Sequence, residues 1–352
     1  MNAISFIPLL LALTLSPLLL GIINRTKAFF AGRHGQPLLQ TYFDLWKLLH
    51  KGAVYSRTTT WIFRAGPMVG LAAAMTAALL MPLCQCPALL AFPADFLLFA
   101  GLLGLMRFFT VVAALDTGSS FEGMGASREV FFSALTEPAL FIALATLVRQ
   151  TGQLSLSTMF EPVSNAHWLH SGPVLGLVVL ALMIVLLAEN SRIPVDDPNT
   201  HLELTMIHEV MVLDHSGPDF AFILYAAALK LWMLGALVLG VVLPFSGGNP
   251  WLNLALALGG MFGLAIVIGV VESVMARLRL LIVPQLLIGA GAVAAVALIL
   301  TLRGTDDDGT DSRAGRADEP EVAGFKPVGR FHSRRCGAGC HAGSVAGSGA
   351  CA

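Results

Sequence analysis

Apolar and polar residues follow one another along this chain in long blocks. Eight apolar runs are separated by shorter polar segments, and each run approaches the roughly 20 residues that an α-helix needs to cross a bilayer. The runs cover residues 3–23, 66–83, 95–115, 129–150, 173–190, 218–243, 251–272 and 280–302. The pattern therefore predicts an all-α integral membrane protein with about eight transmembrane helices.

A further helix is predicted between the first two runs, in residues 35–52. Gln40, Asp44, Lys47 and Lys51 fall on one side of it at helical spacing. The other side is broad and apolar, with Leu38, Leu39, Tyr42, Phe43, Leu45, Trp46 and Leu49. An amphipathic helix of this kind lies along a membrane surface. It could be an ordinary interfacial helix or have a more specific role.

The composition agrees with a membrane protein. The 352 residues are 56% hydrophobic and 12% charged, with a mean hydropathy of +0.77, whereas a soluble domain carries about 25% charge. The net charge of −1 gives no sign of nucleic-acid binding. The first apolar run lacks a clear small-residue cleavage site, so we expect a membrane span there and not a signal peptide.

The distribution of Lys and Arg predicts the orientation of the spans. Of the 14 basic residues before residue 303, seven lie between Arg25 and Arg64, and the opposite side has only Arg149 near the end of a span. Loops rich in Lys and Arg face the cytoplasm. We therefore expect the first loop inside and both termini outside.

One polar segment, residues 189–219, interrupts the apolar blocks. It contains seven of the 15 Asp and Glu residues that precede residue 303, with Arg192 as its only Lys or Arg. Apolar runs flank it on both sides, so it is expected at a membrane edge. Its acidic side chains are typical of a docking surface or an ion entrance.

A helix is predicted inside this polar segment. Asp197 followed by Pro198 suits a helix N-cap with proline at the first helical position. The helix should end near Leu213, before a Ser-Gly-Pro sequence. One face of it would present His201, Thr205, His208 and Glu209.

Charged residues also lie inside the predicted spans, where an unpaired charge costs several kcal/mol. At 1.5 Å per residue, Arg107 lies about 18 Å from the outer end of its span and Glu137 about 12 Å from the inner end of the next. These depths coincide in a hydrocarbon core of about 30 Å, so we predict an Arg107–Glu137 pair. Lys230 lies within a later span, and Glu129 and Glu272 lie near cytoplasmic ends. Such charges either form ion pairs that hold helices together or form a polar path through the membrane for protons or ions, and their number favours a path.

Metal and redox sites are not expected in this chain. His208-Glu209 lacks the second His that a zinc-binding HExxH motif needs, because the next one is His215. His201 and His208 could instead relay protons, although solvated helix histidines are the commoner case. The cysteines are Cys84, Cys86, Cys336, Cys340 and Cys351, none with iron–sulfur spacing. The spacing of Cys336, Cys340 and His341 is one residue longer than the haem-attachment motif.

The composition changes at Arg303. Residues 303–352 are rich in Gly, Ala, Ser, Asp and Arg and have few large apolar side chains. A segment of this composition cannot bury a core. We therefore expect a membrane domain over residues 1–302 and a disordered tail after it.

Several stretches resemble the family of NADH dehydrogenase subunit one of respiratory complex I. QTYFDLWKLLHK, residues 40–51, is similar to the family's Q-x-x-x-D-x-x-K element, and AENSRIPVDDP, residues 188–198, is similar to its A-E-T-N-R-x-P-F-D-x-P. Gly125-Ala-Ser-Arg128 with the later Glu137 resembles its G-x-x-R and following glutamate. Arg277-Leu-Arg279 resembles its basic last loop. The resemblance covers about residues 1–302.

The departures from the complex I pattern point to one branch of that family. Asn199, His201 and Met211 stand where complex I subunits have acidic residues, whereas Asp196 and Glu203 remain. This form resembles the membrane subunit of formate hydrogenlyase and other energy-converting [NiFe]-hydrogenases. The departures weigh against quinone binding.

The resemblance implies a membrane anchor and coupling subunit of an oxidoreductase complex in a bacterial or archaeal inner membrane. Its implied partners are soluble hydrogenase large and small subunits, which would carry the Ni–Fe and Fe–S centres, and antiporter-like membrane subunits. The implied proton path consists of Arg107, Glu129, Glu137, Lys230 and Glu272. The implied cytoplasmic docking and entrance residues are Asp44, Lys47, Arg128, Glu189, Arg192, Asp196, Asp197, Glu203, His208, Glu209, Arg277 and Arg279.

Two alternatives remain open. One is the quinone-site membrane subunit of an NADH:quinone oxidoreductase. The other is a stand-alone ion transporter, which is disfavoured because many transporter folds contain internal repeats and none is visible here.

Overall fold

Helices make up nearly all the secondary structure in the described part of the chain. The computed structural model describes residues 5–83, 86–160, 163, 165–196, 207–243, 249–276 and 278–317, with side chains as far as Arg303. The long helices are α1 (Phe6–Phe30), α3 (Trp61–Leu80), α4 (Asp95–Asp116), α5 (Ser120–Thr151), α7 (Asn165–Glu189), α8 (Pro218–Val242), α9 (Pro250–Val274) and α10 (Val283–Ala317). The short elements are α2 (Gln40–Leu49), α6 (Leu156–Met159) and the 3₁₀ turn η2 (Glu209–Val212). Residues 1–306 form one unit and residues 307–352 a second, and the description below concerns the first.

Eight of the described helices are long and apolar enough to cross a membrane. The predicted all-α membrane fold is therefore confirmed, and each predicted run lies within or close to one of these helices. Some helices extend beyond their apolar runs: α1 reaches Phe30, and α5 begins at Ser120. The chain is thus a multi-pass membrane protein.

The last helix continues beyond the predicted domain boundary at residue 302. α10 ends at Ala317, three residues before Pro320. Its extension contains no proline, and proline is the residue that interrupts a helix most strongly. Residues 318–352 lie outside the described part of the chain, and the disorder predicted for the tail stays a prediction.

The predicted amphipathic helix is present as α2. None of its residues is buried, and Trp46 is 67% exposed. The chain before α2 crosses close to α1, because a Cβ on Gly21 would lie 2.1 Å from the carbonyl oxygen of Leu38. Tyr42 donates a hydrogen bond from its hydroxyl to the carbonyl oxygen of Thr14 in α1. This apolar, exposed face fits a helix at the membrane surface.

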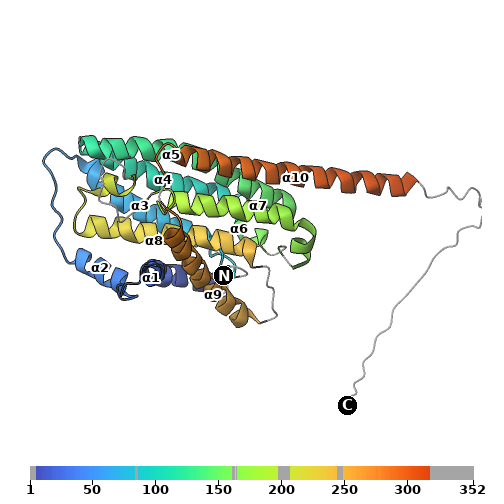
Figure 1. Ribbon diagram of the computed structural model, residues 1–352, viewed down its shortest axis with the longest axis horizontal. Helices are drawn as coiled ribbons and strands as arrows, with labels where there is room; N and C mark the ends of the chain where they lie inside the picture. The colour runs from blue at the N-terminus through green and yellow to red at the C-terminus, as the bar shows by residue number, and fades with distance from the viewer. Residues whose placement is uncertain are drawn as a thin grey trace, which may run out of the picture. The chain divides into compact units, whose positions relative to one another are not determined.

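α8 packs against four other spanning helices, α1, α3, α7 and α9. In Figure 1, α3, α4, α5, α7 and α8 run alongside one another, whereas α9 slants across them. The most apolar stretch of α8 is 72% buried, against 28–44% in the other spans, which makes α8 the central helix. The end of the bundle where α7 ends and α5 and α8 begin is called the polar end below, and it includes η2.

The structure describes only the last part of the helix predicted over residues 198–213. Residues 197–206, with His201 and Thr205, lie outside the described residues, and the remainder forms the short 3₁₀ turn η2 in place of an α-helix. The backbone N–H of Ile207 donates to the carboxylate of Asp196 at 2.9 Å, which fastens the two ends of the segment together. Met211 and Val212 then pack against apolar residues of α4 and α5. This packing fixes a turn where the sequence suggests a continuous helix.

Candidate functional site: a buried ionic cluster and its cavities

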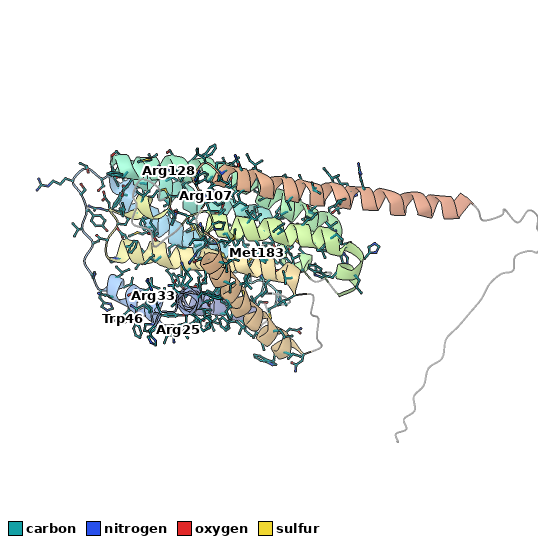
Figure 2. The ribbon with its side chains drawn as sticks, viewed as in Figure 1. Arg25, Arg33, Trp46, Arg107, Arg128 and Met183 are labelled. Atoms are coloured by element: carbon teal, nitrogen blue, oxygen red, sulfur yellow. The ribbon has the colours of Figure 1, made fainter. Side chains whose placement is uncertain are left out.

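Five charged side chains from four helices meet inside the bundle. They are Arg107 of α4, Glu129 and Glu137 of α5, Glu189 at the end of α7 and Lys230 of α8, called the central cluster below. Arg107 forms an ion pair with Glu137 through Nη1, which confirms the predicted pairing. Figure 2 labels Arg107 among the helices of the bundle.

Arg107 joins three carboxylates. Its Nη2 atom lies 2.5 Å from both carboxylate oxygens of Glu189, and its Nε atom lies 3.6 Å from Glu129. A guanidinium offers five donors in a planar fork, so it can serve several acceptors at once, whereas an ammonium acts as a point charge. Lys230 adds the second positive charge, with Nζ 3.7 Å from Glu189. The cluster carries three negative and two positive formal charges.

The cluster lies deep in the bundle. Lys230 is twelve residues into α8, about 18 Å from the start of that helix at 1.5 Å per residue. Glu189 reaches it from the last residue of α7, so α7 ends well inside the polar end of the bundle. Removing one partner of such a buried pair leaves an uncompensated charge. Because the five side chains come from four helices, their ion pairs hold these helices in fixed positions relative to one another.

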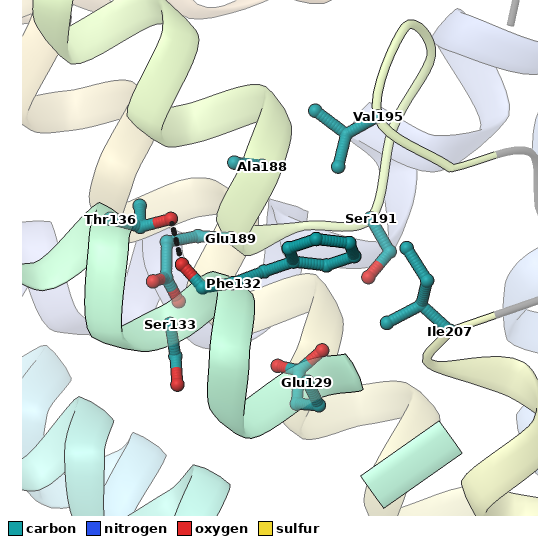
Figure 3. A pocket seen from close by; sticks show the side chains of 9 residues that line it. All are labelled: Glu129, Phe132, Ser133, Thr136, Ala188, Glu189, Ser191, Val195 and Ile207. Carbon is teal, nitrogen blue, oxygen red and sulfur yellow. Dashed lines mark hydrogen bonds between the residues drawn. The ribbon is translucent and has the colours of Figure 1, made fainter. Parts of the chain in front are cut away.

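Two small cavities adjoin the cluster, each of about 10 Å³. The first is lined by Glu129, Glu189 and Ser191, and Figure 3 shows both carboxylates with Thr136 and Phe132 beside them. The second is lined by Arg107, Glu129, His208 and Lys230 among others. Each has about the volume that a single water needs, with polar groups to bind it.

A much larger cavity, of about 540 Å³, lies toward the polar end. Its rim includes the exposed residues Gln36 and Asp44. Its apolar wall comes from α1 and α8, and its polar wall is formed by Asn190, Ser191, Arg192, Asp196, His208 and Glu209. The large cavity shares Ser191 with the first small cavity and His208 with the second. Polar groups therefore continue from the rim to the central cluster.

The two described histidines of the polar segment are uncharged at neutral pH. Burial, followed by the charge of Lys230, lowers the pKa of His208 to about 4. Burial also lowers the pKa of His215 to about 4. The ring of His215 stacks on Phe63 with centroids 3.9 Å apart and planes at 8°.

Glu272 belongs to a second ionic group. Its carboxylate lies 2.8 Å from Nζ of Lys27 and 3.3 Å from Nη1 of Arg192, so the described ion pairs do not connect it with the central cluster. Its side chain is completely buried. The sequence analysis did not single out Lys27, because that residue lies beyond the first apolar run, in the part of α1 that continues to Phe30.

The predicted docking residues are spread over the polar end. Arg128 donates to the sulfur of Met124 at 2.9 Å, and Asp44 accepts from Gln40 at 2.9 Å. Lys47 and Arg279 are exposed. Three further predicted residues, Asp197, Glu203 and Arg277, lie outside the described residues. The described residues contain no group of His, Cys, Asp and Glu that could hold a metal ion.

Gly125, in the G-x-x-R motif, explains how η2 covers the cluster. A Cβ at this position would lie 2.2 Å from Cγ1 of Val210 and 3.0 Å from the carbonyl oxygen of Ile207. Only glycine lets α5 and the segment around η2 approach so closely. Gly125 is therefore needed so that the segment around η2, called the cap below, can pack against α5 and cover the cluster.

Comparison with known proteins identifies a family and related membrane subunits. The sequence model of the NADH dehydrogenase family matches residues 3–302. The chain is 30% identical to formate hydrogenlyase subunit 4 of Escherichia coli, over 84% of this chain and 98% of that protein. It is 30% identical to hydrogenase-4 component C of Escherichia coli, over 83% of this chain and 93% of that protein.

A solved structure has the same fold. A chain in the membrane-bound sulfane sulfur reductase, an archaeal respiratory membrane complex, superimposes with a TM-score of 0.72. The match covers 85% of this chain and 98% of that chain, at 20% identity.

Proposed function

Because this chain belongs to the NADH dehydrogenase family, we propose that it is the membrane anchor and coupling subunit of a hydrogenase-type oxidoreductase complex. Its curated relatives are membrane subunits of such complexes, and it shares their length almost entirely. In this role it docks the soluble electron-transfer arm and contributes to proton or ion translocation. The complex lies in the inner membrane of a bacterial or archaeal cell, with both termini outside.

The observation that carries this proposal is the central cluster with its three cavities. A protein that only anchored a partner would gain nothing from burying the carboxylates of Glu129 and Glu189 with two cations, because apolar residues of similar volume are often at least as stabilising as a buried ion group. Charged residues inside a membrane protein commonly mark ion and proton pathways. The proposed path begins at the rim near Asp44, passes the polar wall of the large cavity and reaches Glu129 and Glu189.

The path leaves the cluster at Glu137. The side chain of Glu137 is 46% exposed although it lies within α5, whereas that of Glu189 is only 5% exposed. A half-exposed carboxylate facing lipid would be costly, so this side of α5 requires a polar neighbour. We propose that an antiporter-like membrane subunit covers it and receives the proton.

The docking surface is assigned to the polar end. The side chains proposed for it are Asp44, Lys47, Arg128, Glu209 and Arg279, whereas Asp196 is buried and belongs to the wall of the large cavity. The soluble hydrogenase large and small subunits would bind there and carry the Ni–Fe and Fe–S centres. Movements of the arm would then act on the segment after Glu189, which lines both the large cavity and the cluster.

A second candidate is a quinone-site subunit of an NADH:quinone oxidoreductase. The large cavity favours it, because about 540 Å³ with an apolar wall and a few polar groups is the size and character of a small-molecule site. A stand-alone ion transporter is the third candidate. The central cluster is the one feature described above that supports it.

Purification in mild detergent separates the three. The proposed function predicts that this chain copurifies with nickel and iron–sulfur subunits and that the complex has hydrogenase activity. NADH:quinone activity in the purified complex would favour the second candidate. Ion transport by the chain alone in vesicles would favour the third.

A further inference from the structure

His208 lies at the boundary between two cavities. It precedes η2 and lines both the large cavity and the small cavity beside Glu129. The large cavity has an exposed rim, whereas the small one adjoins Arg107 and Lys230. His208 is the only titratable residue that the described linings of these two cavities share.

Charged groups from several elements act on this imidazole. Lys230 of α8 and Arg107 of α4 disfavour its protonated form, whereas Asp196 and Glu189 favour it. Glu129 lines the small cavity with it. Burial is the largest cause, and together with these charges it lowers the pKa of His208 to about 4.

We propose that His208 passes protons between the large cavity and the water-sized cavity beside Glu129. This inference rests on the proposed function. A water in the large cavity protonates one ring nitrogen, and the other ring nitrogen releases its proton to a water in the small cavity. The ring is neutral before and after the step, and one proton has crossed from the rim side to the cluster.

The charges around the ring ensure that His208 releases a proton again after binding it. An imidazolium beside two cations is unstable, so a proton that enters leaves promptly. Because Glu189 favours the protonated ring, neutralisation of that carboxylate makes the next protonation harder. The ring therefore accepts protons more readily while the cluster is ionised than after the cluster has taken up a proton.

Exogenous imidazole tests this assignment in the intact complex. The complex is reconstituted in vesicles, and proton movement per redox turnover is measured with hydrogen production or consumption as the redox readout. His208→Ala should lower the ratio of protons moved per turnover at least tenfold. Added imidazole should restore this ratio in a concentration-dependent manner, because the truncated side chain leaves space for the ring next to the large cavity.

His208→Gln should lower the same ratio without rescue, because its amide occupies that space. His34→Ala, an exposed histidine before α2, is the matched control and should behave as wild type.

An unchanged ratio in both His208 variants would overturn the assignment. So would failure of both complexes to assemble, which would make the residue structural. Loss of the ratio without any rescue in His208→Ala would also contradict it, since a proton carrier must be replaceable by its own ring. Glu129→Gln distinguishes this inference from the proposed function. If Glu129→Gln loses coupling and both His208 variants keep it, only the His208 step is wrong. Full coupling in Glu129→Gln would instead contradict the proposed path itself.

Discussion

The Nη2 atom of Arg107 lies 2.5 Å from both carboxylate oxygens of Glu189. This contact joins the middle of α4 to the last residue of α7, 82 positions later in the chain. It holds the end of α7 at the depth of the cluster. The segment that follows Glu189 lines the large cavity, so the contact also fixes where that cavity begins.

Replacing Arg107 should therefore reduce assembly of the complex. Arg107→Met leaves Lys230 as the only cation beside the buried carboxylates of Glu129 and Glu189, and breaking a buried ion group in this way costs about 3–5 kcal/mol. Arg107→Lys keeps the charge but loses the fork, so an intermediate effect is expected. Assembly is measured as the amount of this chain in the purified complex. If Arg107→Met assembles at the wild-type level, the cluster does not hold the four helices together.

Gly125 offers a test of the cap over the cluster. Gly125→Ala introduces a Cβ that would lie 2.2 Å from Val210, so η2 must shift and thermal stability should fall. Gly125→Ala combined with Val210→Ala should recover part of the loss, because the smaller side chain returns space. Gly123→Ala is a matched control in the same helix, since a Cβ there meets no atom within 4 Å. Equal stability of the Gly123 and Gly125 variants would exclude the close approach.

The length of the apolar runs and the estimated depth of the charged residues in the membrane were sufficient to predict part of the fold and of the cluster from the sequence. The length of the apolar runs predicts the eight spans, and counting residues from span ends predicts the contact between Arg107 and Glu137. The contact of Glu189 with Lys230 was not predictable in this way. Glu189 terminates its run and looks like a residue of the membrane edge, but α8 begins farther out than α7 ends. Apolar run length contains no information about that offset between helices.

The assignment of Glu272 illustrates the same difficulty. The sequence analysis grouped it with the proton path because it is an acid near a span end. Its two partners come from α1 and from the segment after α7, and only the packing of α1 against α9 brings them together. No sequence spacing relates these three elements.

Glu272 is accordingly expected to act as a structural anchor. Glu272→Gln leaves Lys27 and Arg192 facing each other without a carboxylate, so less complex should assemble. Adding Lys27→Met should restore assembly, because it removes one uncompensated charge. The complex that does assemble should keep the wild-type ratio of protons moved per turnover. A lowered ratio at full assembly would return Glu272 to the proton path.

The buried ring of His215 predicts a dependence of stability on pH. Its pKa falls from 6.5 to about 4 on folding, so the unfolded chain binds the proton first as the pH drops. Stability should therefore decrease as the pH falls from about 6.5 toward 4, by about 2 kcal/mol from this residue at pH 5. His215→Phe should reduce that decrease. Resistance of this chain to trypsin, measured in the purified complex against temperature at pH 7.5 and pH 5, tests it. An identical pH dependence in wild type and His215→Phe would show that His215 makes no such contribution.

If the central cluster moves protons in step with redox turnover, Glu137→Gln should separate proton movement from that turnover. Glu137 is the most exposed carboxylate of the cluster, and without it Arg107 still pairs with Glu189, so the complex should assemble. The measurement is the number of protons moved per hydrogen molecule turned over by the reconstituted complex. Glu137→Gln should lower this ratio at least tenfold in fully assembled complex. A wild-type ratio in that variant would contradict proton movement by the cluster.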